Sequence, residues 1–124
     1  MARVLVVDDE STMREMLREA LERRGHTADE AADGREALQR LAEHKPDLVI
    51  TDLVMPEMEG IELIQAFRRK CPEIPIIAIS GGGRVGPENY LSMAGQIGAN
   101  RIFAKPFRLE EILTAVRELT AKST

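Results

Sequence analysis

The chain has 124 residues, of which 44% are hydrophobic, and its formal net charge is -4. This length predicts one globular domain over residues 1–124 with no effector domain, and the acidic balance argues against binding to nucleic acid or to an anionic membrane surface. Cys71 is the sole cysteine and cannot form an internal disulfide, and the lack of a membrane-length apolar stretch or a signal-peptide pattern predicts a cytoplasmic protein.

Short apolar runs alternate with helical patterns along the whole chain. The apolar runs predict strands over residues 4–7, 27–32, 47–52, 74–79 and 102–104. The periodic segments predict helices over residues 12–24, from 33 to a point before 46, from 60 to near 71, from 87 onward, and from 109 to 119. Thr12 with Glu15 and Asp33 with Glu36 have the spacing of helix caps. Acidic residues interrupt the second strand, which suits an edge position.

This alternation predicts a fold of the α/β class. Strands joined by helical crossovers run parallel, and the helices cover both faces of the sheet. Five such units favour the flavodoxin-like (βα)5 doubly wound sheet with strand order 2-1-3-4-5.

Polar side chains end the central strands on the same edge of that sheet. Asp8 and Asp9 follow the first strand, Asp52 ends the third, Ser80 follows the fourth and Lys105 follows the fifth. The strand order makes the first and third strands neighbours, so three carboxylates are expected to crowd together. At ~4 Å and an effective dielectric of about 20, each pair of like charges costs on the order of 4 kcal/mol. Bound Mg²⁺ would remove this repulsion, and its preference for phosphate oxygens points to phosphoryl chemistry.

These motifs resemble the receiver domain of bacterial two-component response regulators, in particular single-domain receivers like the chemotaxis regulators. The resemblance covers the whole chain. It depends on the Val-Asp-Asp-Glu run at 7–10, the Asp-Leu-Val-Met-Pro-Glu-Met-Glu-Gly run at 52–60, Ser80, and the Lys-Pro-Phe run at 105–107.

The resemblance implies that Asp52 is the phosphoacceptor and takes a phosphoryl group from a sensor histidine kinase or a histidine phosphotransfer protein. Mg²⁺ is the implied cofactor. Asp9 and Asp52 would bind the ion directly, Asp8 would bind it through water, and Val54 would offer its main-chain carbonyl.

Two further residues receive roles from the same resemblance. Ser80 would donate its hydroxyl to the phosphoryl group, and Lys105 would pair with it, with a cis bond between Lys105 and Pro106. Movement of Ser80 would then reach the loop at 81–86 and the surface of the fourth helix and fifth strand. Ile102 departs from the family, which commonly has an aromatic residue three positions before the lysine.

We therefore expect a stand-alone receiver that signals by phosphorylation-dependent contact with a protein target, as a monomer or weak dimer. It would catalyse only its own phosphorylation and dephosphorylation. The sequence identifies neither the kinase nor the target, nor the phosphoryl lifetime. Three alternatives are an intermediate that passes the phosphoryl group to another histidine, a degenerate receiver used for dimerisation, and an Asp-nucleophile phosphatase. The phosphatase reading is weakened because Val54 stands where that class carries a second acid.

Overall fold

Five parallel strands form one sheet in the order β2-β1-β3-β4-β5. The computed structural model describes residues 2–53, 60–80 and 98–121. The strands are β1 (Arg3–Val7), β2 (Thr27–Ala31), β3 (Leu48–Asp52), β4 (Ile76–Ser80) and β5 (Arg101–Ala104). The described helices are α1 (Ser11–Arg23), α2 (Gly34–Glu43), α3 (Gly60–Lys70) and α5 (Leu109–Thr120). The predicted strand order and the edge position of the second strand are therefore confirmed.

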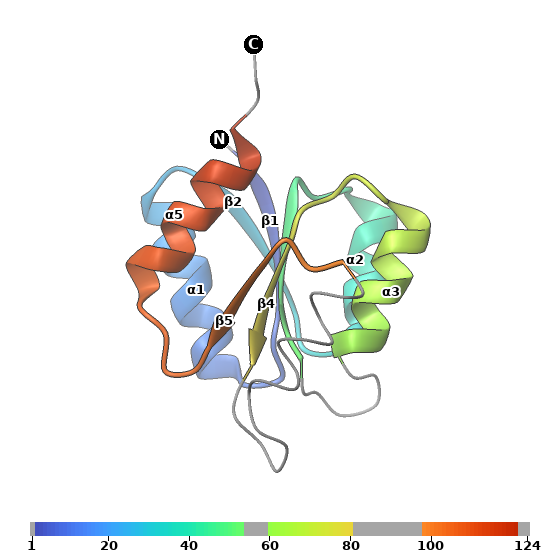
Figure 1. The fold of residues 1–124 in the computed structure, drawn as a ribbon, viewed down its shortest axis with the longest axis horizontal. Coiled ribbons are helices and arrows are strands. Elements are labelled where there is room, and N and C mark those ends of the chain that lie inside the picture. The colour runs from blue at the N-terminus through green and yellow to red at the C-terminus, as the bar shows by residue number, and fades with distance from the viewer. Residues whose placement is uncertain (1, 54–59, 81–97, 122–124) are drawn as a thin grey trace.

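The helices lie in two layers, one on each side of the sheet. Helices α1 and α5 cover one face, and α2 and α3 cover the other (Figure 1). Because every strand runs in the same direction, all their carboxyl ends meet along one edge, at the bottom of Figure 1. The predicted loop at 81–86 and the predicted helix from 87 lie outside the described residues.

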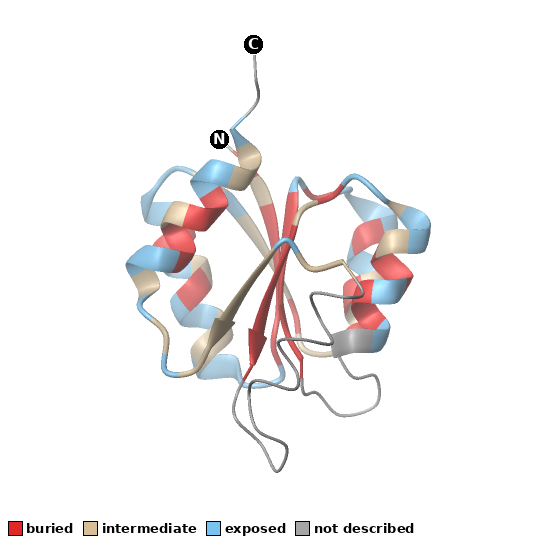
Figure 2. Ribbon diagram, in the orientation of Figure 1, coloured by how far each residue is buried: buried red, intermediate tan, exposed pale blue. Residues whose placement is uncertain are grey.

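The core is divided by the sheet because side chains alternate between its faces. Strands β3 and β4 are buried throughout, and Figure 2 shows the buried residues concentrated in the central strands. On β1, Val4 and Val6 pack on the side of α1 and α5, whereas Leu5 and Val7 pack on the side of α2 and α3. Strands buried on both faces read as continuous apolar runs, which is why they could be located in the sequence.

Helix α1 begins one residue before the predicted start. The prediction that Thr12 caps this helix is wrong, because the cap position is Glu10 and no side chain caps the helix there. Asp8 Oδ1 accepts a hydrogen bond from the amide of Glu10 at 2.9 Å, and this turn starts the helix at Ser11. The prediction for α2 is confirmed, since Asp33 accepts a hydrogen bond from the amide of Glu36.

Arg68, near the end of α3, joins two loops through its guanidinium group. Its Nη1 donates to the carbonyls of Pro72 and Ile74 at 3.0 and 2.5 Å. Its Nε and Nη2 donate to the carbonyl of Gly98 at 3.1 and 2.6 Å, and Nη2 also donates to Asn100 Oδ1 at 2.7 Å. Burial lowers the pKa of Arg68. The group therefore clamps the loop before β5 to the loop before β4.

The clamp accounts for the late start of β4, which was predicted over 74–79 and is observed at Ile76–Ser80. Asn100 Oδ1 accepts a hydrogen bond from the amide of Ile76 at 2.9 Å and so stands in for a strand partner. Pro75, which has no amide hydrogen, lies just outside the strand.

Replacing Gly98 by alanine is expected to lower the free energy of unfolding by on the order of 1–3 kcal/mol. The φ angle of Gly98 is +113°, which L residues rarely adopt, and the new methyl group would stand 2.9 Å from Arg68 Nε. Chemical denaturation measures the effect. Gly25→Ala is the control, because exposed Gly25 also has a positive φ, of 90°, without the Arg68 contact. Equal losses in the two variants would contradict a role for that contact.

Candidate functional site

Three carboxylates meet where β1 and β3 end. Asp8 and Asp9 follow β1, and Asp52 is the last residue of β3, which pairs directly with β1. One oxygen from each of these side chains lies within 4.8 Å of the others. Asp8 and Asp52 are buried, whereas Asp9 is exposed. The structure thus brings together the three acids that the sequence predicted would converge.

Within the cluster, the charged form of the Asp8 carboxyl is disfavoured. Burial raises the pKa of Asp8 to about 6, the hydrogen bond from the amide of Glu10 opposes this rise, and the nearby carboxylate of Asp52 adds to it. A charge that is disfavoured by burial and by a like charge is stabilised by any cation that enters the site. The cluster therefore favours a bound cation.

Lys105 reaches this cluster from the end of β5. Its Nζ lies 3.3 Å from Asp52 Oδ2, and its amide donates to the carbonyl of Ser80 at 2.7 Å. Burial alone would lower the pKa of Lys105, but the carboxylates of Asp52 and Asp8 outweigh burial and raise it. The lysine is therefore held as a cation. The Lys105–Pro106 peptide bond is cis, as the resemblance implied.

Ser80 completes the group of predicted side chains. It is the last residue of β4 and is fully buried. Among the residues that the structure describes, none forms a hydrogen bond with its Oγ. A buried hydroxyl is usually hydrogen-bonded, since leaving it unsatisfied costs about 1–3 kcal/mol. This hydroxyl is suited to bind an oxygen atom brought by a ligand.

The donor set fits Mg²⁺. In an octahedral shell with bonds of about 2.1 Å, neighbouring ligand oxygens lie roughly 3 Å apart and opposite ones about 4 Å apart. Oxygens of Asp9 and Asp52 can supply part of such a shell, with water filling the rest, and the Asp8 oxygen of the same 4.8 Å group can accept a hydrogen bond from one of those waters. Val54, whose carbonyl was also expected to bind the ion, lies outside the described residues.

The sequence profile of the response regulator receiver domain matches residues 4–117. The chain belongs to this family. A response regulator MprA of Mycolicibacterium vanbaalenii is 37% identical over 123 residues, covering 98% of this chain and 52% of that protein. The MprA of Mycobacterium ulcerans is 36% identical over 98% of this chain and 51% of its own length. The receiver domain therefore spans about half the length of these curated relatives.

Solved receiver domains have the same fold. A receiver domain protein from Clostridium thermocellum superposes with a TM-score of 0.89 at 27% identity, covering 97% of this chain and 94% of that one. The chemotaxis response regulator CheY4 of Vibrio cholerae has a TM-score of 0.84 and 33% identity, covering 96% of this chain and 98% of its own. No helix within the described part of the receiver domain is long and apolar enough to cross a membrane.

Sequence reasoning missed one residue that contacts the site. Arg14 of α1 donates through Nη1 to the main-chain carbonyl of Asp8 at 2.7 Å. Its acceptor is a carbonyl group, so the pairing leaves no pattern of opposite charges in the sequence. Its position within the first turn of the helix that follows Asp8 was the only available signal.

Proposed function

We propose that Asp52 accepts a phosphoryl group from a histidine kinase or a histidine phosphotransfer protein and that this modification controls binding to a protein target. The observation that carries the proposal is the convergence of the three carboxylates, with Lys105 Nζ 3.3 Å from Asp52 Oδ2. Membership of the receiver family supports the same conclusion.

In the proposed reaction, an Asp52 carboxylate oxygen attacks the phosphorus atom in line with the leaving group. A bond forms between this oxygen and phosphorus, and the bond from phosphorus to the donor histidine nitrogen breaks. Lys105 holds its positive charge beside the transferred oxygens, and Ser80 Oγ donates a hydrogen bond to one of them. Asp9 and Asp52 would hold Mg²⁺ directly and Asp8 through water, and the bound ion would supply positive charge that offsets the charge of the phosphoryl oxygens.

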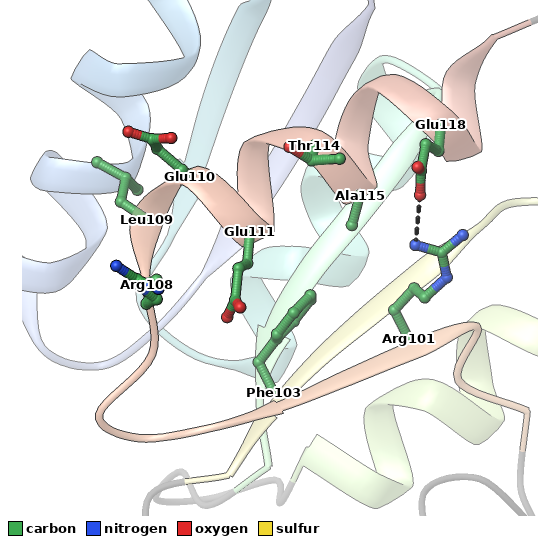
Figure 3. Close-up of a pocket in the computed structure, with 9 residues that line it drawn as sticks. All are labelled: Arg101, Phe103, Arg108, Leu109, Glu110, Glu111, Thr114, Ala115 and Glu118. Carbon is green, nitrogen blue, oxygen red and sulfur yellow. Dashed lines mark hydrogen bonds and ion pairs between the residues drawn. The ribbon is translucent and has the colours of Figure 1, made fainter.

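The proposed output surface includes β5, because the strand leads directly into Lys105. Ile102 packs against the core on the side of α2 and α3, whereas Phe103 packs on the side of α5. Successive side chains of a strand point to opposite faces of the sheet, and Phe103 is only partly buried. It lines a groove of about 840 Å³ between β5 and α5, beside an ion pair of 2.9 Å between Arg101 and Glu118 (Figure 3). Aromatic and arginine side chains of this kind are enriched in protein interfaces.

Acetyl phosphate tests the phosphorylation step without a kinase. Intact-mass measurement is expected to show the addition of one phosphoryl group in the presence of Mg²⁺ and none in EDTA. Uptake that is equal in EDTA would contradict the role of the metal. Return of the group from the labelled protein to purified histidine phosphotransfer domains would instead favour the relay role.

The proposal also separates this chain from a phosphatase. We expect the protein not to hydrolyse a small phosphate ester repeatedly. Continuous hydrolysis of p-nitrophenyl phosphate would therefore contradict the proposed function. The net charge of -4 supports protein contact rather than nucleic-acid contact as the output of these residues. We place this function in the cytoplasm.

A further inference from the structure

The loop that carries two of the three acids is held from the side of α1. Arg14 donates through Nη1 to the carbonyl oxygen of Asp8 at 2.7 Å. The amide of Asp8 donates to the carbonyl of Ala31 at 3.1 Å, and Asp8 Oδ1 accepts from the amide of Glu10 at 2.9 Å. These three bonds fix the backbone on both sides of Asp9. The position of its exposed carboxylate therefore depends on the turn rather than on packing of its own side chain.

The guanidinium of Arg14 is itself fixed by a second partner. Its Nε donates to Glu30 Oε1 on β2 at 2.8 Å, and its side chain is only 17% exposed. Glu30 Oε2 forms an ion pair of 2.6 Å with Arg18, one helical turn further along α1. Glu30 is thus held by two arginines, and a planar guanidinium with two fixed acceptors has little freedom to rotate.

Arg14 contacts the main chain of Asp8 and not its carboxylate, and this decides how the contact can affect a bound cation. Lys105 bonds a carboxylate oxygen of Asp52, whereas Arg14 bonds a main-chain oxygen of Asp8. Arg14 therefore does not compete with a cation or its water shell for a carboxylate oxygen of Asp8. Groups that orient ligands from outside the coordination shell change metal affinity without touching the metal.

We propose that Arg14 is a positioning residue for the magnesium site, because it fixes the turn that carries Asp8 and Asp9. The inference deepens the proposed function and rests on it. Loss of the Arg14 contact loosens the turn, so the free protein must order the acids when the ion binds, and its affinity for Mg²⁺ falls.

The test compares Arg14→Met with Arg18→Met in Mg²⁺ titrations by isothermal titration calorimetry. Each substitution removes one arginine from Glu30, but only Arg14 also contacts the carbonyl of Asp8. Arg14→Met is expected to raise the Kd for Mg²⁺ by roughly tenfold, and Arg18→Met is expected to leave it near the wild-type value. Thermal denaturation without metal checks that the two variants lose similar stability.

Three outcomes decide the inference. An unchanged Kd in Arg14→Met, with the wild type binding Mg²⁺, would overturn the positioning role and leave the proposed function standing. Equal weakening in both arginine variants would also overturn it, since loss of the Glu30 contact would then be the cause. A wild type that binds no Mg²⁺ would overturn the metal site and this inference together. Arg14→Lys, which keeps the positive charge on a single ammonium group, is expected to show an intermediate Kd and serves if Arg14→Met does not fold.

Discussion

Asp52→Asn is expected to abolish phosphoryl uptake from acetyl phosphate, because an amide is too weak a nucleophile to attack phosphorus. Asp52 ends a fully buried strand, and its carboxylate lies at the meeting point of the acids and Lys105. The measurement is intact-protein mass after incubation with acetyl phosphate and Mg²⁺. Circular dichroism is expected to show an unchanged fold, since the asparagine keeps the size of the side chain.

The matched control for this variant is Asp47→Asn. Asp47 is exposed and lies just before the start of β3, at the opposite end of the strand from Asp52. Its carboxylate accepts a hydrogen bond from the amide of Arg3 at 2.8 Å. Among the hydrogen bonds described for Asp47, none comes from a cationic side chain such as that of Lys105. Normal labelling is expected here. Continued labelling of Asp52→Asn at the wild-type level would show that another residue is the acceptor.

Asp8→Asn is expected to stabilise the metal-free protein at about pH 7.5 by on the order of 1–3 kcal/mol. The folded-state pKa of Asp8 is raised from 3.8 to about 6, chiefly by burial. A raised carboxyl pKa means that the folded state binds the proton more tightly than the unfolded state does. The protonated Asp8 carboxyl therefore makes its full contribution to stability below about pH 4, and this contribution is lost as the pH rises through about 6. Urea denaturation across this pH range measures the loss of stability with rising pH. The loss should be smaller in Asp8→Asn than in the wild type.

Asp33→Asn is the control for the change from carboxylate to amide. Asp33 caps α2 through a hydrogen bond from the amide of Glu36, and asparagine caps helices about as well as aspartate. Its stability is expected to stay near that of the wild type. A metal-free Asp8→Asn protein that is less stable than the wild type at about pH 7.5 would show that the charged carboxylate does not strain the fold.

Added Mg²⁺ should make the wild type more stable than Asp8→Asn, which is the reverse of the order expected without metal. Since the ion binds the folded state, it is expected to raise the melting temperature of the wild type. The rise should be smaller in Asp8→Asn and should vanish in Asp9→Asn. A wild type whose melting temperature ignores Mg²⁺ would contradict the assignment of these acids to a metal site.

The strand order and the convergence of the site were predictable from the sequence for a physical reason. Buried parallel strands are continuous apolar runs, and each central run ends abruptly at a polar residue such as Asp52 or Ser80. Parallel strands place those ends on one edge, so a one-dimensional pattern fixes a three-dimensional neighbourhood. Lys105 beside Asp52 follows from the same argument, although 53 positions separate them.

What could not be predicted depends on contacts between side chains and the main chain. Arg14 and Arg68 both donate to carbonyl oxygens, which every residue carries, so neither contact leaves a spacing or charge pattern. The start of α1 was misplaced for a similar reason. Asp8 accepts from the amide of Glu10, and this bond decides the boundary although Thr12 and Glu15 matched a helix cap.

The clamp at Arg68 also bears on how sequences with this fold can diverge. Among the described residues, the oxygens that receive its hydrogen bonds belong to the main chain at Pro72, Ile74 and Gly98 and to a side chain at Asn100. Exposed Pro72 can be exchanged for many residues without loss of its carbonyl acceptor. Two loops can therefore drift in composition over evolutionary time while their spacing persists, with the constraint concentrated on the arginine, the asparagine and the glycine that leaves room for the guanidinium.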